Sequence, residues 1–168
     1  MPLLALVCAA CGDEPRDSGE QYRNIVPFDT AQLRVVTATD TVTLTVELAE
    51  SREQQTLGLM ERRALAEDAG MLFVYPNKQP ETAGFWMYRT RIPLDIAFVD
   101  DSGVIRSIRA MEPCATDIAE GCPTYPPAAP YRAALEVNRG YFTRRGIGIG
   151  GRVLLQDTVT RRRGSSTR

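Results

Sequence analysis

The residue types that can carry chemistry gather in one stretch of the chain. Residues 84–103, GFWMYRTRIPLDIAFVDDSG, contain the only tryptophan, Trp86, followed by two arginines. The stretch also places Asp95 inside an apolar run, where a carboxylate must be paired or become neutral. Glu136 occupies a similar position in a second apolar run. If these two carboxyl groups faced one cleft, they would suit glycoside hydrolysis.

The chain contains no histidine, and this absence removes several kinds of catalytic site. Nucleophilic catalysis by Ser-His-Asp or Cys-His sets is excluded, and so are the imidazole ligands of most catalytic zinc sites. A general acid or base must be Asp, Glu, Tyr, Cys or the single lysine, Lys78. The glycine-rich run GIGIGG lacks the Lys-Ser/Thr ending of a phosphate loop. We therefore expect no cofactor, no metal and no catalysis.

Aromatic and arginine side chains of the same stretch form a candidate ligand site. If residues 85–90 alternate as in a strand, Trp86 and Tyr88 share one side and can stack against a sugar or another flat ligand. Arg89 and Arg91 on the other side can hold a carboxylate or phosphate in a bidentate manner. Aromatic core residues and a solvated arginine face are the plain alternatives. The predicted ligand-binding set is Arg62, Trp86, Tyr88, Arg89, Thr90, Asp95 and Glu136.

Two further interpretations concern the same blocks of sequence. The first is that Asp95 forms a structural ion pair, with Arg62 or Arg89 as its partner. The second concerns four methionines, because thioether sulfur is a ligand for Cu(I). Methionine more commonly fills gaps in a core, so no metal site is predicted from them. These methionines are Met60, Met71, Met87 and Met111.

Length and charge limit the classes of protein to which the chain can belong. Its 168 residues indicate one domain with short extensions. The net charge of −1 leaves no basic footprint for nucleic acid, so no nucleic-acid partner is expected. Beyond the N-terminus, no apolar run approaches the roughly 18 residues of a membrane span.

The N-terminus resembles a bacterial lipoprotein signal, in which a cysteine after small residues is acylated. Leu3 to Ala10 form an apolar run directly before Cys11. We expect residues 1–11 to be this signal, 12–30 a flexible tether, 31–157 a single β-domain and 158–168 a disordered basic tail. The membrane would then be a partner through the lipid anchor on Cys11. The alternative is a redox or metal pair formed by Cys8 and Cys11.

The remaining cysteines, Cys114 and Cys122, frame the segment CATDIAEGC in a region rich in proline and glycine. In an oxidising compartment, two thiols that close so short a loop form a disulfide. In the cytosol they would be free thiols or an incomplete metal pair. The N-terminal signal and this pair therefore indicate the same localisation: exported, and anchored to the membrane on the periplasmic or extracellular side.

Hydrophobic periodicity predicts mainly strands. Residues 42–48 alternate between apolar and polar side chains, as in a half-buried strand. Ser51 and Gln54 have the spacing of a helix capping box. Residues 70–75 read as a buried strand that Pro76 ends, and residues 101–103 as a hairpin turn. The predicted fold is mainly β, a compact antiparallel barrel or jelly-roll-like sandwich with one or two short helices.

Five blocks of sequence occur in an order that resembles a known family. They are GLMER, GMLFVY, FWMYRTRIPLDIAFVD, ALEVNRG and IGIGGRVLL, and the resemblance covers residues 41–155. Together they resemble the family called domain of unknown function 192. The resemblance implies a compact mainly-β domain, commonly exported in bacteria, and no particular activity. Tyr88 and Arg89 stand where that family usually has lysine and asparagine, so a mechanism based on that lysine is not expected here.

These observations combine into one functional hypothesis. The chain is expected to be an exported, lipid-anchored β-domain that acts as a binding or accessory module for a small anionic or carbohydrate ligand at the cell envelope. One alternative is an enzyme that acts on envelope glycans through Asp95 and Glu136. A second alternative is a structural module whose aromatic patch binds another protein.

Overall fold

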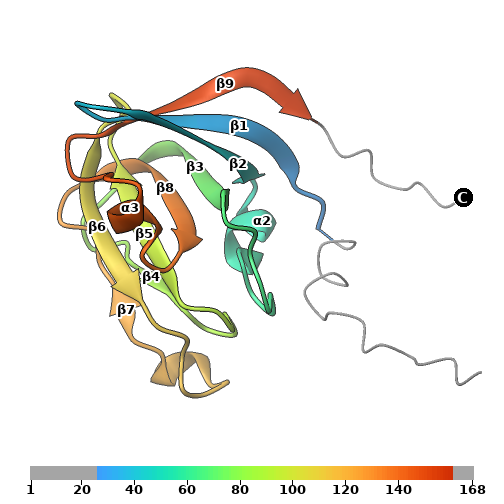
Figure 1. Ribbon diagram of the computed structural model, residues 1–168. Coiled ribbons are helices and arrows are strands. Elements are labelled where there is room, and N and C mark those ends of the chain that lie inside the picture. Colours follow the sequence, from blue (N-terminus) through green and yellow to red (C-terminus); the bar gives the residue numbers. More distant parts are fainter. Residues whose placement is uncertain (1–25, 161–168) are drawn as a thin grey trace, which may run out of the picture.

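The computed structural model describes residues 26–160, which are built around one curled sheet (Figure 1). The sheet has seven strands in the order β6-β5-β8-β3-β2-β1-β9. Its strands are β1 (Asp29–Val36), β2 (Thr41–Ala49), β3 (Ala69–Gln79), β5 (Leu94–Val99), β6 (Ile105–Met111), β8 (Tyr131–Asn138) and β9 (Arg152–Thr160). A second sheet pairs β4 (Phe85–Trp86) with β7 (Thr124–Tyr125). The prediction of a mainly β, barrel-like fold is confirmed.

The helices are short and connect strands. They are α2 (Arg52–Leu57), α3 (Tyr141–Arg144) and the 3₁₀ helix η1 (Ala119–Gly121). The predicted capping box is present at the start of α2, where Ser51 accepts a hydrogen bond from the Gln54 N–H. Within residues 26–160, no helix has the length and apolar character that a membrane span requires.

The sheet is antiparallel except between β2 and β3, which are parallel. This one parallel pair arises because α2 and the turns after it carry the chain back to the starting end of the sheet, and the remaining pairs are antiparallel as expected. At one end the outer strands meet, since Val104 and Arg152 form a bridge. The Val153 N–H also donates to the Gly103 carbonyl oxygen at 2.7 Å. The sheet therefore closes partly, in the manner of a barrel.

Hydrophobic side chains cover both faces of the central strands. One core contains Leu44 and Val46 of β2 together with Tyr141 and Phe142 of the α3 segment. The second core, on the other face of β3, β5 and β8, contains Met71, Phe73, Ile96 and Phe98. Every residue of β5 is consequently buried. The second core supports the candidate site, because the turns after α2 and the short strand β4 lie over it.

Two local predictions were wrong. Pro76 does not end its strand, since β3 continues to Gln79, and the pairing of β3 with β8 changes register between Val74 and Gln79. Proline is tolerated where the ladder is interrupted in this way. The strand expected over residues 85–90 is only two residues long. It ends because Arg89 adopts a positive φ of 53°, which turns the chain.

The described domain extends beyond its predicted limits. The first strand, β1, begins at Asp29, and Phe28 before it is buried. The last strand, β9, continues to Thr160. The predicted signal, the acceptor Cys11 and most of the predicted tether and tail lie outside the described residues, so those predictions stay predictions.

Gly70 of β3 offers a direct test of how closely the central strands approach. A Cβ atom there would lie 2.6 Å from the backbone oxygen of Glu136 on β8. We expect Gly70→Ala to lower the free energy of unfolding by about 1–3 kcal/mol, because backbone atoms must move. Gly148→Ala is the matched control, since a Cβ there meets no atom within 4 Å. Urea denaturation measures both, and equal effects of the two variants would contradict the account.

Candidate functional site

The candidate site begins with a row of side chains that crosses four strands. In the sheet register, Glu47 of β2 lies beside Met71 of β3, Met71 beside Glu136 of β8, and Glu136 beside Ile96 of β5. Because side chains alternate along a strand, all four project to the face that carries the second core. Two carboxyl groups are therefore held on one face, separated by a single methionine.

A buried arginine binds one of these carboxyl groups. Arg62, in the turn region after α2, donates to the two carboxylate oxygens of Glu47 at 2.7 and 2.5 Å. Its side chain is only 5% exposed, and its guanidinium lies 6.0 Å from the centre of the Phe28 ring. The bidentate geometry fixes the charge of Arg62 on Glu47. Arg62 therefore binds Glu47 directly and acts on Glu136 only through its charge.

Glu136 is the acidic residue that lacks a cation of its own. Glu136 is 4% exposed. Burial raises the pKa of Glu136 to about 8, and the nearby Arg62 charge opposes this rise without cancelling it. At neutral pH the side chain is therefore mostly a neutral carboxylic acid, which can donate as well as accept a hydrogen bond.

Glu136 lines a cleft with a volume of about 210 Å³. Six aromatic residues line the same cleft: Phe73, Tyr75, Phe85, Trp86, Tyr88 and Tyr131. Trp86 is 45% exposed, and its ring lies 5.5 Å from that of Tyr88. Amide and hydroxyl groups come from Gln55, Thr56, Gln79 and Thr90. Among the described residues that line this cleft, none is a lysine or an arginine.

The arginines of the opening stretch bind within the protein. Arg89 donates to Glu61 at 2.6 Å, and Arg91 binds Glu61 at 3.0 Å and Asp117 at 2.7 Å. The Arg91 and Arg89 hydrogen bonds hold the pKa of Glu61 below its usual value. Glu61 and Arg89 both adopt positive φ angles, of 59° and 53°, and the Glu61 N–H donates to the Arg89 carbonyl oxygen at 2.8 Å. These contacts join the turn after α2 to the turn after β4.

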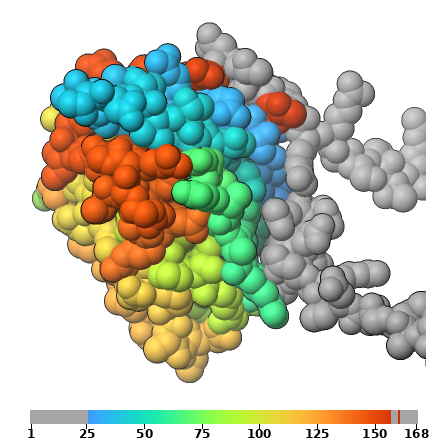
Figure 2. Space-filling model, viewed as in Figure 1, coloured from blue at the N-terminus to red at the C-terminus, as the bar shows by residue number. Residues whose placement is uncertain are grey.

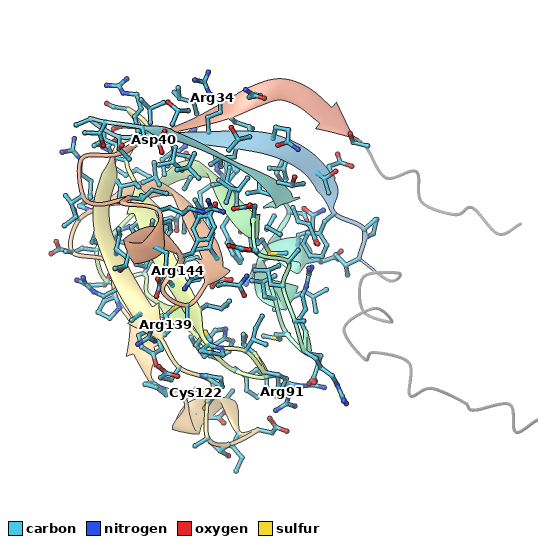
Figure 3. The ribbon with its side chains drawn as sticks, in the orientation of Figure 1. Arg34, Asp40, Arg91, Cys122, Arg139 and Arg144 are labelled. Carbon is cyan, nitrogen blue, oxygen red and sulfur yellow. A yellow bond between two sulfur atoms is a disulfide. The ribbon has the colours of Figure 1, made fainter. Side chains whose placement is uncertain are left out.

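The disulfide predicted between Cys114 and Cys122 is confirmed. Its loop carries Asp117, which binds Arg91, and leads into β7, which pairs with β4 through Trp86 and Thr124. Figure 3 shows Arg91 and Cys122 at the same lower end of the molecule. In the space-filling view this end is formed by the yellow and light orange residues that follow β6 (Figure 2). The disulfide loop therefore supports the strand that presents Trp86.

Asp95 does not belong to the cleft. It alternates with Leu94 and Ile96 of the second core and so projects to the opposite face of the sheet from Glu136. Its carboxylate accepts from the Gly140 N–H at 2.8 Å, and the Arg139 Nε lies 3.5 Å away. Burial raises the pKa of Asp95, against the opposing effect of these two partners.

The structure therefore separates the predicted site residues into two groups. Trp86, Tyr88, Thr90 and Glu136 line the cleft. The other three, Arg62, Arg89 and Asp95, do not. Asp95 pairs with neither Arg62 nor Arg89, so that proposed ion pair was wrong. Because Asp95 and Glu136 lie on opposite faces, they do not form the carboxylate pair on one cleft that the enzyme alternative requires.

The described residues do not favour a metal site. Met71, Met87 and Met111 are fully buried in the second core, and Cys114 and Cys122 are joined to each other. Within residues 26–160, no group of three or more histidine, cysteine or acidic side chains is placed to hold a metal ion.

Sequence reasoning missed three residues of the site. Glu47 is one of the polar residues of the alternating strand, and the cover provided by Arg62 reduces its side-chain exposure to 20%. Glu61, which follows Met60 in the block GLMER, was not predicted to belong to the site. Tyr75 was read only as the end of a strand, yet it lines the cleft. Glu47 and Glu136 are far apart in the sequence and give no local pattern, because only the register between the strands brings them to one face.

The proton on Glu136 predicts how stability depends on pH. The folded protein keeps this proton up to about pH 8, whereas the unfolded chain releases it near the ordinary pKa of 4.5. The free energy of unfolding therefore contains a term that falls as pH rises from 4.5 to about 8, on the order of a few kcal/mol in total. Glu136→Gln should remove this decline. Urea denaturation at several pH values measures it, and parallel curves for the two proteins would contradict the assignment.

Several solved structures are similar to this chain, and two of them come from bacteria. A protein from Sinorhizobium meliloti 1021, described as a "putative transcription regulator", is 35% identical with a TM-score of 0.66, over 75% of this chain and 93% of that one. A protein of unknown function from Novosphingobium aromaticivorans DSM 12444 is 32% identical with a TM-score of 0.65, over 74% of this chain and 84% of that one. The comparison with curated proteins gave no match.

The sequence also matches a family model directly. The match covers residues 34–155, from β1 to the first half of β9, and so includes the cleft, the disulfide loop and the Glu47–Arg62 pair. The family is described as Uncharacterized ACR. The resemblance inferred from the five sequence blocks is confirmed, and the chain belongs to family DUF192.

Proposed function

We propose that this protein is an exported, lipid-anchored β-domain that binds a small carbohydrate ligand in the cleft beside Trp86. The observation that carries the proposal is the half-exposed Trp86, packed against Tyr88 in a cleft that the buried Glu136 also lines. Aromatic rings stack on the apolar face of a sugar, and the amide, hydroxyl and carboxyl groups around them match its hydroxyls. The role is binding rather than catalysis.

The charge of the cleft favours a carbohydrate over a small anion. An anion would need a free guanidinium or ammonium group, yet Arg62 is held by Glu47 and Arg91 by Glu61 and Asp117. The described lining contains one acidic residue and no basic one. A ligand with a carboxylate or phosphate would therefore meet no opposite charge there.

Two features support localisation at the cell envelope. The apolar run before Cys11 has the form of a lipoprotein signal, and the Cys114–Cys122 disulfide is the kind of bond that persists in an oxidising compartment. Acylation of Cys11 would place the domain at the membrane surface on a tether that ends near Phe28.

Fluorescence of Trp86 tests carbohydrate binding directly, because it is the only tryptophan. Since Trp86 is 45% exposed, its emission should be accessible to acrylamide and should shift saturably with oligosaccharides. Trp86→Ala, followed by calorimetry, should weaken binding roughly tenfold or more. Ile118→Ala is the control, since Ile118 is 64% exposed and lies outside the cleft. Unchanged emission with every oligosaccharide of a broad panel would refute the proposal.

Lipid anchoring is tested by producing the full chain in a bacterium that acylates lipoproteins. We expect the chain to incorporate labelled palmitate and to partition with membranes, and Cys11→Ser to abolish both. Cys8→Ser should leave both unchanged, because only the acceptor cysteine is modified. If the two variants instead behave alike, the Cys8–Cys11 pair is the better interpretation.

A further inference from the structure

The cleft contains a buried polar group for which the protein supplies no hydrogen-bonding partner. Among the contacts of the described residues, the Glu136 carboxyl makes no hydrogen bond, and its one favourable electrostatic neighbour is Arg62. The residue is 4% exposed and lines the cleft. A buried carboxyl group without a partner is costly, and proteins rarely keep one unless a ligand completes it.

The groups that surround Glu136 decide which charge it can accept. From β2, Glu47 faces it across Met71, and from the turns after α2, Arg62 stands beside it. Tyr75 of β3 is also close, because a negative charge on Glu136 contributes to raising the pKa of the Tyr75 hydroxyl. The positive charge of Arg62 is already paired with Glu47 in a bidentate contact. An ionised Glu136 would therefore have no positive charge of its own to pair with.

The aromatic walls of the cleft favour the same kind of ligand. A cation is attracted to the faces of tryptophan and tyrosine rings, most strongly where water is excluded. Trp86, Tyr88, Tyr75 and Tyr131 all line the cleft, and the described lining holds no side chain that would repel a cation directly. Aromatic faces around an acidic group are the arrangement by which proteins recognise ammonium groups.

We propose that the ligand carries a protonated amine, as an amino sugar does, and that Glu136 is the residue that selects it. This inference rests on the proposed carbohydrate function of the cleft. The ammonium group pairs with the Glu136 carboxylate, and the ring to which it is attached stacks against Trp86 and Tyr88. On binding, the Glu136 O–H bond breaks, its electron pair stays on the carboxylate and the proton passes to solvent.

Release of this proton gives the proposal a distinctive signature. Burial holds the pKa of Glu136 at about 8, so at pH 7 most molecules carry the proton before the ligand binds. An ammonium ligand stabilises the carboxylate and expels the proton. A neutral sugar leaves the proton in place, because the neutral acid can donate to its hydroxyl groups.

The experiment compares three trimers of similar shape at pH 7: the glucosamine trimer, the N-acetylglucosamine trimer and the glucose trimer with the same linkage. Calorimetry in phosphate and in HEPES, whose ionisation enthalpies differ and neither of which carries a primary ammonium group, gives both the affinity and the protons released. We expect the glucosamine trimer to bind at least tenfold more tightly than the other two. It should release the Glu136 proton, less the fraction of a proton that its own amine takes up at pH 7 to become the bound ammonium. The neutral trimers should release none.

Two variants of the full chain complete the test. Glu136→Gln should abolish both the preference for the amine and the release of the proton, while neutral trimers still bind. Glu120→Gln, an exposed acidic residue of η1 outside the cleft, is the matched control and should change neither. The amide of glutamine has nearly the shape of the neutral acid. Should Glu136→Gln fail to fold, proton release by the unaltered chain still decides the question.

The outcomes separate this inference from the proposed function. If all three trimers bind with similar affinity and release no proton, carbohydrate binding stands and the role of Glu136 in selecting an amine is overturned. If the amine preference persists in Glu136→Gln, the inference is likewise overturned. If none of the three trimers binds, both the carbohydrate function and the inference fail.

Discussion

The structure depends on a shortage of positive charge inside the protein. Glu47 and Glu136 project from β2 and β8 to the same face of the sheet, and the buried Arg62 between the turn and the sheet neutralises only Glu47. A second charge in this apolar environment is costly, so Glu136 keeps its proton. The same shortage leaves one carboxyl group available at the cleft, which is the chemical basis of the proposed site.

This arrangement requires the turn with Arg62 to stay in place above the sheet, and a continuous set of contacts holds it there. Glu61, next to Arg62, binds Arg89 and Arg91, and Arg91 binds Asp117 in the disulfide loop. The loop continues into β7, which pairs with the strand that presents Trp86. The aromatic residues and the acidic group that line the cleft are therefore positioned by one connected structure rather than by separate loops.

Local patterns of the sequence predicted the strands, the capping box of α2, the hairpin turns and the disulfide, because each depends on neighbouring residues alone. Four residues of the cleft, including Trp86 and Glu136, were also identified. The partners of the buried charged groups were not identified. Asp95 was predicted to pair with Arg62 or Arg89, whereas it binds the Gly140 N–H and Arg139. Such pairings depend on strand register and on the positive φ of Arg89, neither of which a local pattern contains.

The central claim is that Glu136 retains a proton in the free protein, and carbon-13 NMR of the glutamate carboxyl groups tests it most directly. The Glu136 resonance is assigned as the signal missing from Glu136→Gln, and its chemical shift is followed from pH 4 to pH 9. The account predicts a midpoint near 8, well above the ordinary value of 4.5. A midpoint near 4.5 would show that Glu136 is ionised at neutral pH, which would contradict the account of the charge shortage and of the cleft built upon it.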